Sequence, residues 1–152
     1  MRKKEKEIQD RAEIEAVIRK AEVCRLGLSA DGQPYVVPLN FGFDGKCLYF
    51  HTGQEGKKID MIRRNHRVCF EVDVDCRLVR GDTPCHWTMQ YQSVIGYGTA
   101  SLLTDEADKR HALDIIMRHY SERPGEYPRH LVDRLAIIQV TIDSMTGKRS
   151  GN

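Results

Sequence analysis

Short apolar runs joined by tight turns fill most of this chain. The first three occupy residues 23–30, 35–43 and 47–51, with Asp31-Gly32 and Asp44-Gly45 between them. An Asp-Gly pair between two such runs is a strong β-hairpin signal, because both residues accept positive φ angles in a tight turn. Consecutive hairpins pair neighbouring strands antiparallel. The alternation of strands and helices that a parallel sheet requires is missing, so the pattern predicts a mainly β fold.

Later runs continue this pattern. Strands are expected at residues 67–75, 91–103 and about 135–142, whereas residues 76–90 stay unassigned apart from a loop at Gly81-Asp82-Thr83-Pro84. Six strands connected largely by hairpins favour a closed antiparallel barrel over a parallel sheet. No repeat, low-complexity tract or long linker divides the chain, so residues 1–152 are expected to form a single domain.

Three helices are expected beside the strands. The first spans about residues 8–21, the second residues 57–65, and the third begins at Thr104 or Asp105 as its N-cap and ends at Pro124-Gly125. Helical spacing of apolar residues predicts which side chains face the core. These are Ile14, Val17, Ile18 and Ala21 in the first helix, Ile59 and Ile62 in the second, and Leu113, Ile116, Met117 and Tyr120 in the third.

Composition and charge limit the classes of partner. Apolar residues make up 40% of the chain and charged residues 30%, which is typical of a globular domain. The net charge of +2 gives no strong case for nucleic acid or an anionic membrane. No apolar run approaches the roughly 20 residues of a membrane span, and the N-terminus lacks a secretion signal, so we expect a cytoplasmic protein.

The cysteines and histidines do not suggest a metal site or a nucleophile. The five cysteines are odd in number, scattered and without a C-x-x-C pair, and in a reducing compartment they are expected to be thiols. No set of Cys and His positions has tetrahedral metal-ligand spacing. No serine or cysteine lies in a known nucleophile motif.

The strand at residues 34–43 is the first candidate for ligand binding. Its odd positions are bulky and apolar, whereas Val36, Pro38, Asn40 and Gly42 on the other face are smaller or polar. Pro38 cannot donate a ladder hydrogen bond, which places it at a sheet edge or an irregularity. Such a strand could present backbone groups to a flat ligand. The alternative is an ordinary edge strand with solvent on one side.

The segment at residues 51–58 is the second candidate. His51-Thr52 ends a strand, a loop with two glycines follows, and a helix begins at Lys57-Lys58. Free backbone N–H groups at a helix start, together with ammonium groups and a hydroxyl, suit a phosphate. The alternative is that both lysines are solvated helix residues.

Gly96-Tyr97-Gly98 is not a dinucleotide-binding motif. It lacks the third small residue of that fingerprint and lies within a strand, not between a strand and a helix. Val94, Gly96, Gly98 and Ala100 share one face of the strand, which predicts close packing against another surface.

Taken together, these segments resemble a known family. Residues 34–58, together with residues 63–73, resemble the flavin-binding half of the pyridoxamine 5'-phosphate oxidase-like superfamily. Val37-Pro38-Leu39-Asn40, Tyr49-Phe50-His51-Thr52 and residues 85–98 look most like its nitroimidazole-resistance branch. The resemblance covers about residues 10–148.

The resemblance implies a six-stranded antiparallel split β-barrel that binds flavin mononucleotide (FMN). It also implies a homodimer with the flavin bound at the subunit interface. Val37, Pro38, Leu39 and Asn40 would border the flavin ring, and Lys57 and Lys58 would hold the phosphate. The other cofactor-binding positions implied are His51, Thr52, Trp87, Tyr91 and Ser93.

Two departures from the true oxidases affect the expected reaction. Val36 stands where those enzymes place a phosphate-binding arginine, and their C-terminal substrate-binding segment has no counterpart here, so vitamin B6 oxidation is not expected. His51 is the one ionisable side chain placed near the reacting ring and is a candidate proton donor, with simple packing as the alternative role.

The function implied is that of an FMN-dependent oxidoreductase. It would pass electrons from a donor to a small organic acceptor, for example a nitro-aromatic compound, with the chemistry supplied by the cofactor. The alternatives are a flavin- or haem-binding module without turnover, and a reductase that uses a deazaflavin. The sequence names neither the acceptor nor the electron donor.

Overall fold

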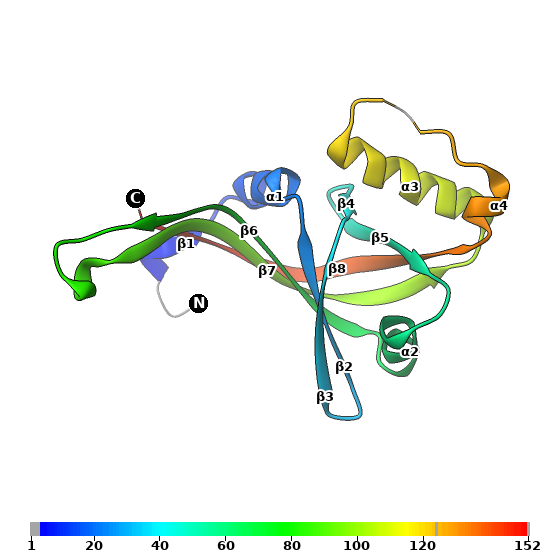
Figure 1. The fold of residues 1–152 in the computed structure, drawn as a ribbon, viewed down its shortest axis with the longest axis horizontal. Helices are drawn as coiled ribbons and strands as arrows, with labels where there is room; N and C mark the ends of the chain where they lie inside the picture. The colour runs from blue at the N-terminus through cyan, green and yellow to red at the C-terminus, as the bar shows by residue number, and fades with distance from the viewer. Residues whose placement is uncertain (1–3, 124, 152) are drawn as a thin grey trace.

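The computed structural model describes residues 4–123 and 125–151. Over these residues the chain forms eight strands, four α-helices (α1 to α4) and two short 3-10 helices (Figure 1). The strands are β1 (Glu7–Ile8), β2 (Cys24–Ala30), β3 (Gln33–Leu39), β4 (Gly42–Phe43), β5 (Cys47–Gly53), β6 (Arg67–Val79), β7 (Thr88–Leu103) and β8 (Leu135–Ser150). The helices are η1 (Lys4–Lys6), α1 (Arg11–Lys20), α2 (Lys57–Arg64), η2 (Pro84–His86), α3 (Glu106–Tyr120) and α4 (Arg129–Val132).

All the strands belong to one antiparallel sheet. Its order is β3-β2-β6-β7-β8-β5-β4, and β1 pairs with β8 beyond the end of β5. The six long strands correspond to the six that the sequence predicts, and the split β-barrel fold is confirmed. The expectation of a closed barrel is wrong, because in the described residues no ladder joins β3 to β4, the two ends of the path.

The Asp-Gly turns form as predicted. Asp31 and Gly32 have φ angles of 51° and 77°, the two positive values that the β2–β3 turn needs. In the second turn the Asp44 carboxylate accepts hydrogen bonds from the backbone N–H groups of Lys46 and Cys47, at 2.8 and 2.7 Å. These local bonds start β5 in the correct register without help from distant residues.

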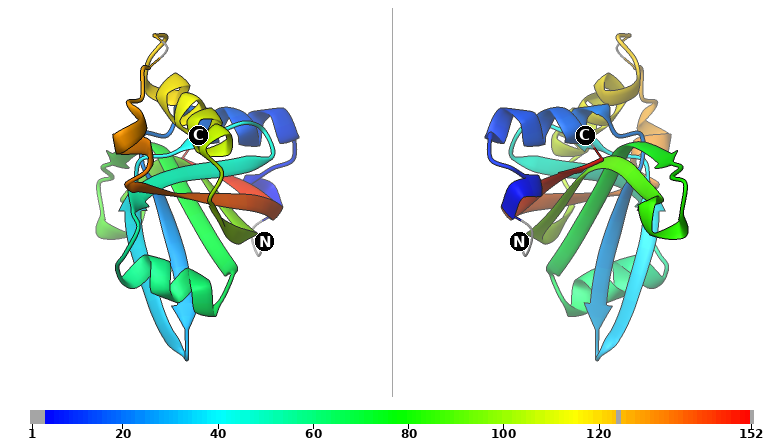
Figure 2. Two further views of the ribbon diagram at one scale, coloured as in Figure 1. Left: turned by 90° about the vertical axis from the view of Figure 1, so that its right-hand side faces the viewer. Right: turned by 90° about the vertical axis from the view of Figure 1, so that its left-hand side faces the viewer.

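The apolar core divides into two clusters. The first fills the barrel interior with side chains of β2, β5, β6 and β8, and α1 and α2 cover it. The second lies on the other face of β5 and β8, where Cys47, Tyr49 and Ile137 pack beneath α3. Figure 2 shows α1 and α3 together on one side of the sheet, with α2 at the opposite end.

The third helix contacts this second cluster through a face that differs from the predicted one. Its N-cap is Asp105, whose carboxylate accepts from the Asp108 N–H, and Leu113 and Ile116 are buried as expected. Met117 and Tyr120, however, are 36% and 41% exposed. Ala112 and Ile115 take their place in the core, because the helix rests on β4 and β5 with that face.

Strand lengths differ most from expectation in the second half of the chain. Strands β6 and β7 extend into a long hairpin, and β8 continues to Ser150. Residues 75–90 of this hairpin, called the arm below, project from the barrel (Figure 1). The arm begins at a β-bulge in which Asp75 adopts a positive φ of 56°.

The close approach predicted around Gly96 is confirmed. A Cβ atom at Gly96 would lie 2.3 Å from the Phe70 ring, and one at Gly98 would lie 2.5 Å from the Thr141 carbonyl oxygen. None of the helices in the described part of the chain is both long and apolar enough to cross a membrane.

Candidate functional site

The outer face of the sheet carries two of the predicted site residues, Pro38 on β3 and Ser93 on β7. Two rows of directly opposed residues cross four strands there: Val36–Gly27–Cys69–Tyr97 and Pro38–Arg25–Glu71–Ile95. Directly opposed side chains project to the same side of a sheet, so each row forms a continuous surface. The next row begins at Asp73 and continues through Ser93 to Lys148. These eleven residues define the outer face below.

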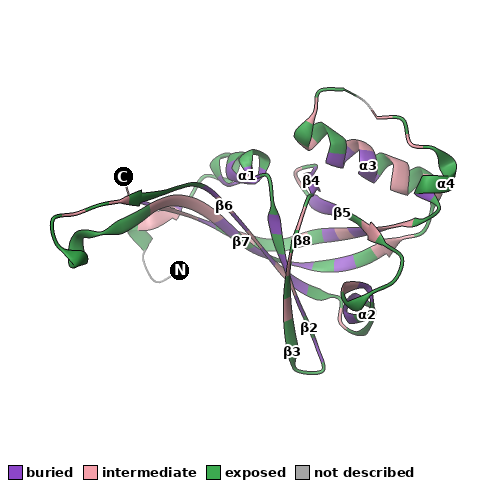
Figure 3. Ribbon diagram, in the orientation of Figure 1, coloured by how far each residue is buried: buried purple, intermediate pink, exposed green. Residues whose placement is uncertain are grey.

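Exposure along the outer face is high for apolar side chains. Val36 is 64% exposed, Tyr97 is 53% exposed, and Ile95 also faces solvent. Between Val36 and Tyr97 lie only Gly27 and Cys69. Their side chains are small, so the surface of the row is recessed in its middle relative to its two ends. Figure 3 shows exposed residues along β3 and on the arm. A face of this kind is typical of an interaction or ligand surface.

Arg25 neutralises only part of the negative charge on this face. Its Nη1 donates to Glu71 Oε2 at 3.1 Å and also to Asp73 Oδ1. One guanidinium thus serves two carboxylates. Desolvation and the neighbouring Asp73 carboxylate raise the pKa of Glu71, and Arg25 offsets this only in part.

Strand β3 offers backbone groups on its open edge. Pro38 has no N–H, so its pair with Arg25 is a non-hydrogen-bonded pair of the antiparallel ladder. Hydrogen-bonded and non-hydrogen-bonded pairs alternate along such a ladder, so the pair of Val36 with Gly27 is non-hydrogen-bonded as well. Val36 therefore directs its N–H and C=O away from β2, between the prolines at positions 34 and 38. Pro38 lies at a sheet edge as the sequence predicts, and Val36 is a candidate that sequence reasoning missed.

Lys57 lies against the same strand. Its Nζ is 4.5 Å from the centroid of the Tyr35 ring, close enough for a cation–π interaction that directs the ammonium group toward β3. Lys58 follows it in the first turn of α2 and is half-buried. The N-cap residue of α2 is Gly56, which has no side chain, so no side-chain cap occupies the first N–H groups of the helix. Val37 and Leu39 point inward and pack on the core, whereas Asn40 is exposed.

The other predicted residues lie farther away. His51 is exposed and Thr52 half-buried near the end of β5, which pairs with β8 and not with β3. Ser93 lies on the outer face, but β2 and β6 separate it from Pro38, about 14 Å at ordinary strand spacing. Trp87 lies on the arm with the Arg80 guanidinium 5.8 Å from its ring centroid.

Tyr91 has a cationic neighbour that sequence reasoning missed. Lys148 Nζ lies 5.4 Å from the centroid of the Tyr91 ring, and Lys148 is paired with Ser93. The strand alternation of residues 144–148 could have placed Lys148 on this face, had β8 not been predicted to end at about residue 142. Within one chain, the predicted residues thus form two groups, one around β3, β5 and α2 and one on β7 and the arm.

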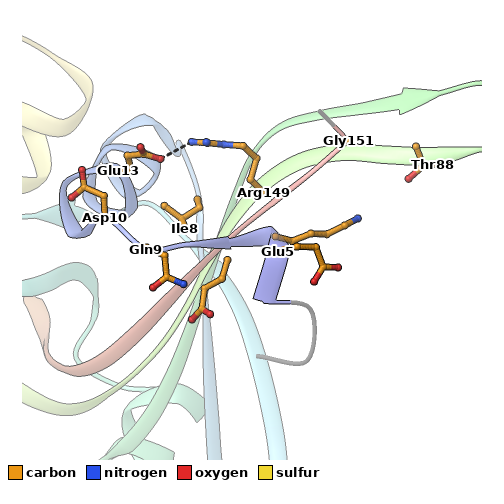
Figure 4. Close-up of a pocket in the computed structure, with 10 residues that line it drawn as sticks. Glu5, Ile8, Gln9, Asp10, Glu13, Thr88, Arg149 and Gly151 are labelled. Carbon is orange, nitrogen blue, oxygen red and sulfur yellow. Dashed lines mark hydrogen bonds and ion pairs between the residues drawn. The ribbon is translucent and has the colours of Figure 1, made fainter.

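A cavity of about 680 Å³ lies elsewhere, between the N-terminal segment and the end of β8 (Figure 4). Two contacts tie its walls together: Arg149 pairs with Glu13 at 2.9 Å, and Lys6 donates to Ser150 at 2.8 Å. We interpret it as the junction that holds β1 to β8. Across residues 4–123 and 125–151, no group of three His, Cys, Asp or Glu side chains could hold a metal ion.

Comparisons with known proteins agree with this fold. The family model described as pyridoxamine 5'-phosphate oxidase matches residues 10–149. Among curated proteins, an uncharacterized protein of Rhizobium meliloti strain 1021 is 32% identical over 65 residues. That match covers 43% of this chain and 42% of the relative, so the chain aligns with less than half of that protein.

Solved structures extend the comparison. A proposed 5-nitroimidazole antibiotic resistance protein of Bacteroides thetaiotaomicron is 40% identical, with a TM-score of 0.84 over 93% of this chain and 85% of that one. The flavocytochrome Anf3 of Azotobacter vinelandii has a TM-score of 0.86 at 20% identity, over 100% of this chain and 72% of that one, and shows the fold alone. A FAD-binding protein of Mesorhizobium loti is 28% identical, with a TM-score of 0.68 over 92% and 94% of the two chains. The chain therefore belongs to the pyridoxamine 5'-phosphate oxidase family.

Proposed function

We propose that this protein is an FMN-dependent oxidoreductase that reduces a small organic acceptor. The observation that carries the proposal is the position of Lys57, whose ammonium group lies over Tyr35 on the strand expected to border the flavin ring. A cation and an edge strand with free backbone groups are the two features that a flat ligand with an anionic tail needs. Membership of the family and the FAD-binding relative of Mesorhizobium loti support a flavin as the ligand.

The residues fit the cofactor as follows. Lys57 and Lys58, with the free N–H groups at the start of α2, would hold the phosphate. The Val36 N–H and the Pro38 carbonyl on the open edge of β3 would pair with the polar rim of the ring. Bound flavin supplies the hydride or electron transfer. We propose His51, which is exposed near the end of β5, as the group that holds or releases a proton.

We also propose that two copies of the chain complete each site. The predicted residues on β7 and the arm lie too far from β3 to contact the same ring in one chain. The exposed side chains of Val36, Ile95 and Tyr97 give the outer face an apolar surface that a second copy would cover. In such a homodimer Trp87, Tyr91 and Ser93 of one copy would approach the ring held by the other.

The acceptor we propose is a nitro-aromatic compound. Support comes from the relative of Bacteroides thetaiotaomicron, whose proposed role is resistance to 5-nitroimidazole antibiotics and which is 40% identical over most of both chains. We further propose that a nicotinamide nucleotide donates the electrons and that the reaction takes place in the cytoplasm.

The test is titration of flavin-free protein with FMN, followed by anaerobic reduction. We expect a yellow complex that NADH or NADPH reduces and that a 5-nitroimidazole reoxidises. Lys57→Gln should raise the Kd for FMN roughly tenfold to a hundredfold, the range for losing a charged hydrogen bond. Lys46→Gln is the matched control, since Lys46 is also exposed but lies in the β4–β5 turn.

Three outcomes would contradict these statements separately. A protein that takes up no FMN refutes the flavin site, and equal Kd values for the Lys57 and Lys46 variants refute the phosphate contact. Flavin that binds but is never reduced by nicotinamides refutes the oxidoreductase. A haem spectrum in the purified protein would indicate a haem-binding module without turnover. Extraction of a deazaflavin would indicate a deazaflavin-dependent reductase.

A further inference from the structure

A groove between α1 and α3 is the strongest feature outside the proposed flavin site. Its volume is about 450 Å³, and β4 closes it from below. His111, Ile115 and Arg118 line it from α3, where their spacing places them on one helix face. Arg19 of α1 lines the opposite wall. The two helices lie on the same side of the sheet with β4 between them (Figures 1 and 2).

The floor of the groove is apolar and firmly held. Phe43 and Ile115 form it, and both are buried in the core. His119 closes one end, because its Nε2 donates to the Ala21 carbonyl oxygen at 2.6 Å and its ring packs 4.3 Å from that of Phe41. A small apolar ring bound in the groove would contact Ile115 and the part of Phe43 that Arg19 leaves uncovered.

The rim of the groove carries guanidinium groups with free donors. Arg19 lies 4.9 Å from the centroid of the Phe43 ring and donates to the Phe43 carbonyl oxygen at 3.4 Å, and its contact with Glu15 is long, at 3.7 Å. Within the described residues, Arg118 makes no ion pair or side-chain hydrogen bond. Such planar groups bind carboxylates in a bidentate manner.

One carboxylate in the wall sets the charge that the groove can accept. Desolvation acts to raise the pKa of Asp44, but hydrogen bonds from the Cys47 and Lys46 N–H groups and the Tyr49 hydroxyl outweigh it and lower the pKa. Asp44 is thus an anion. Glu15, which contacts Arg19 at 3.7 Å, is itself paired with Arg11 at 2.9 Å. With that pair counted as neutral, the guanidinium groups of Arg19 and Arg118 and the Asp44 carboxylate leave one net positive charge, which matches a monoanion better than a phosphate dianion.

We propose that this groove binds a small organic monocarboxylate with a flat apolar body, held by Arg19 and Arg118 above Phe43 and Ile115. The site shares no residue with the proposed flavin site, so either can fail without the other. It would allow an organic acid to bind while the barrel carries its cofactor.

The test is a titration of the purified protein with benzoate, in which amide chemical shifts in two-dimensional NMR spectra report binding. Benzyl alcohol, which has the same ring without the charge, is the ligand control. We expect benzoate to shift the amides of residues 42–45 and 111–119 saturably, and benzyl alcohol to leave them nearly unchanged. Arg118→Gln should raise the benzoate Kd about fivefold, as expected for a solvent-exposed ion pair. Arg134→Gln, an exposed arginine outside the groove, should leave it unchanged.

The proposal is overturned if benzoate shifts amides elsewhere on the molecule, or no more than benzyl alcohol does. It is also overturned if the Arg118 and Arg134 variants bind benzoate equally well while their thermal unfolding curves match that of the unaltered protein.

Discussion

At the scale of single residues, the charges of the outer face control a thiol beside it. Cys76 is exposed at the start of the arm, and its Sγ donates a hydrogen bond to Asp73 Oδ2 at 2.8 Å. That hydrogen bond, with some desolvation and the nearby negative charge of Asp73, raises the pKa of Cys76 to about 11. Exposure alone would suggest a reactive cysteine, but only the thiolate is nucleophilic, so Cys76 should react slowly near neutral pH.

We predict that Asp73→Asn accelerates the alkylation of Cys76. The substitution removes the charge that disfavours the thiolate, so the pKa of Cys76 falls and its reaction begins at lower pH. At pH 8.5 the rate with iodoacetamide should rise about tenfold or more. Mass spectrometry of the modified peptides gives the rate. Cys85, exposed near the tip of the arm, serves as the internal reference within each sample. A ratio of the two rates that is the same in both proteins would contradict the prediction.

At the scale of elements, α3 is positioned by a glycine. A Cβ atom at Gly42 would lie 2.6 to 2.7 Å from backbone atoms of Ile115 and Ile116, so β4 and α3 touch backbone to backbone. We predict that Gly42→Ala separates them and lowers the free energy of unfolding by about 2 kcal/mol or more, as overpacking does. Chemical denaturation measures the change. At Gly53 in β5, the nearest atom to an added Cβ is 3.9 Å away. Gly53→Ala should therefore cost much less, and equal losses in the two variants would refute this account of α3.

The elements also differ in how well the sequence alone predicted them. Local signals placed the hairpins well, because Asp31-Gly32 and the Asp44 side chain fix their turns without distant contacts. The end of β8 escaped prediction because polar residues begin at Asp143, which the β7–β8 register skips, and Ser144 and Thr146 remain in the strand through pairing with β7. Lys148 was missed for this reason. Likewise, helical spacing could not rank Met117 against Ile115, since the placement of α3 on β4 decides which is buried.

At the scale of the whole molecule, the proposed function depends on a second copy of the chain. The outer face combines exposed apolar side chains at Val36, Ile95 and Tyr97 with the ion pairs of Arg25 in its centre. The arm adds further exposed apolar side chains, Leu78, Trp87 and Met89. A two-stranded extension of this kind gains little stability by itself. A partner that covers both the arm and the outer face would stabilise the hairpin and bring the two groups of site residues together.

We therefore predict that Tyr97→Glu converts the protein to a monomer and weakens FMN binding in the same step. Tyr97 is paired with Cys69 and Ser144, so a new carboxylate there meets no like charge within its own row and should leave the single chain folded. In an interface, the same carboxylate would be buried without a partner, which costs several kcal/mol. Sedimentation velocity gives the mass, and FMN titration gives the Kd.

Leu131→Glu is the control, because Leu131 on α4 is 49% exposed, close to the 53% of Tyr97, but lies away from the outer face. If the Tyr97 variant stays dimeric, the outer face is not the interface. If it becomes monomeric but binds FMN with unchanged Kd, the site is complete in one chain. The proposal that β7 and the arm of one copy contact the flavin held by the other is then wrong.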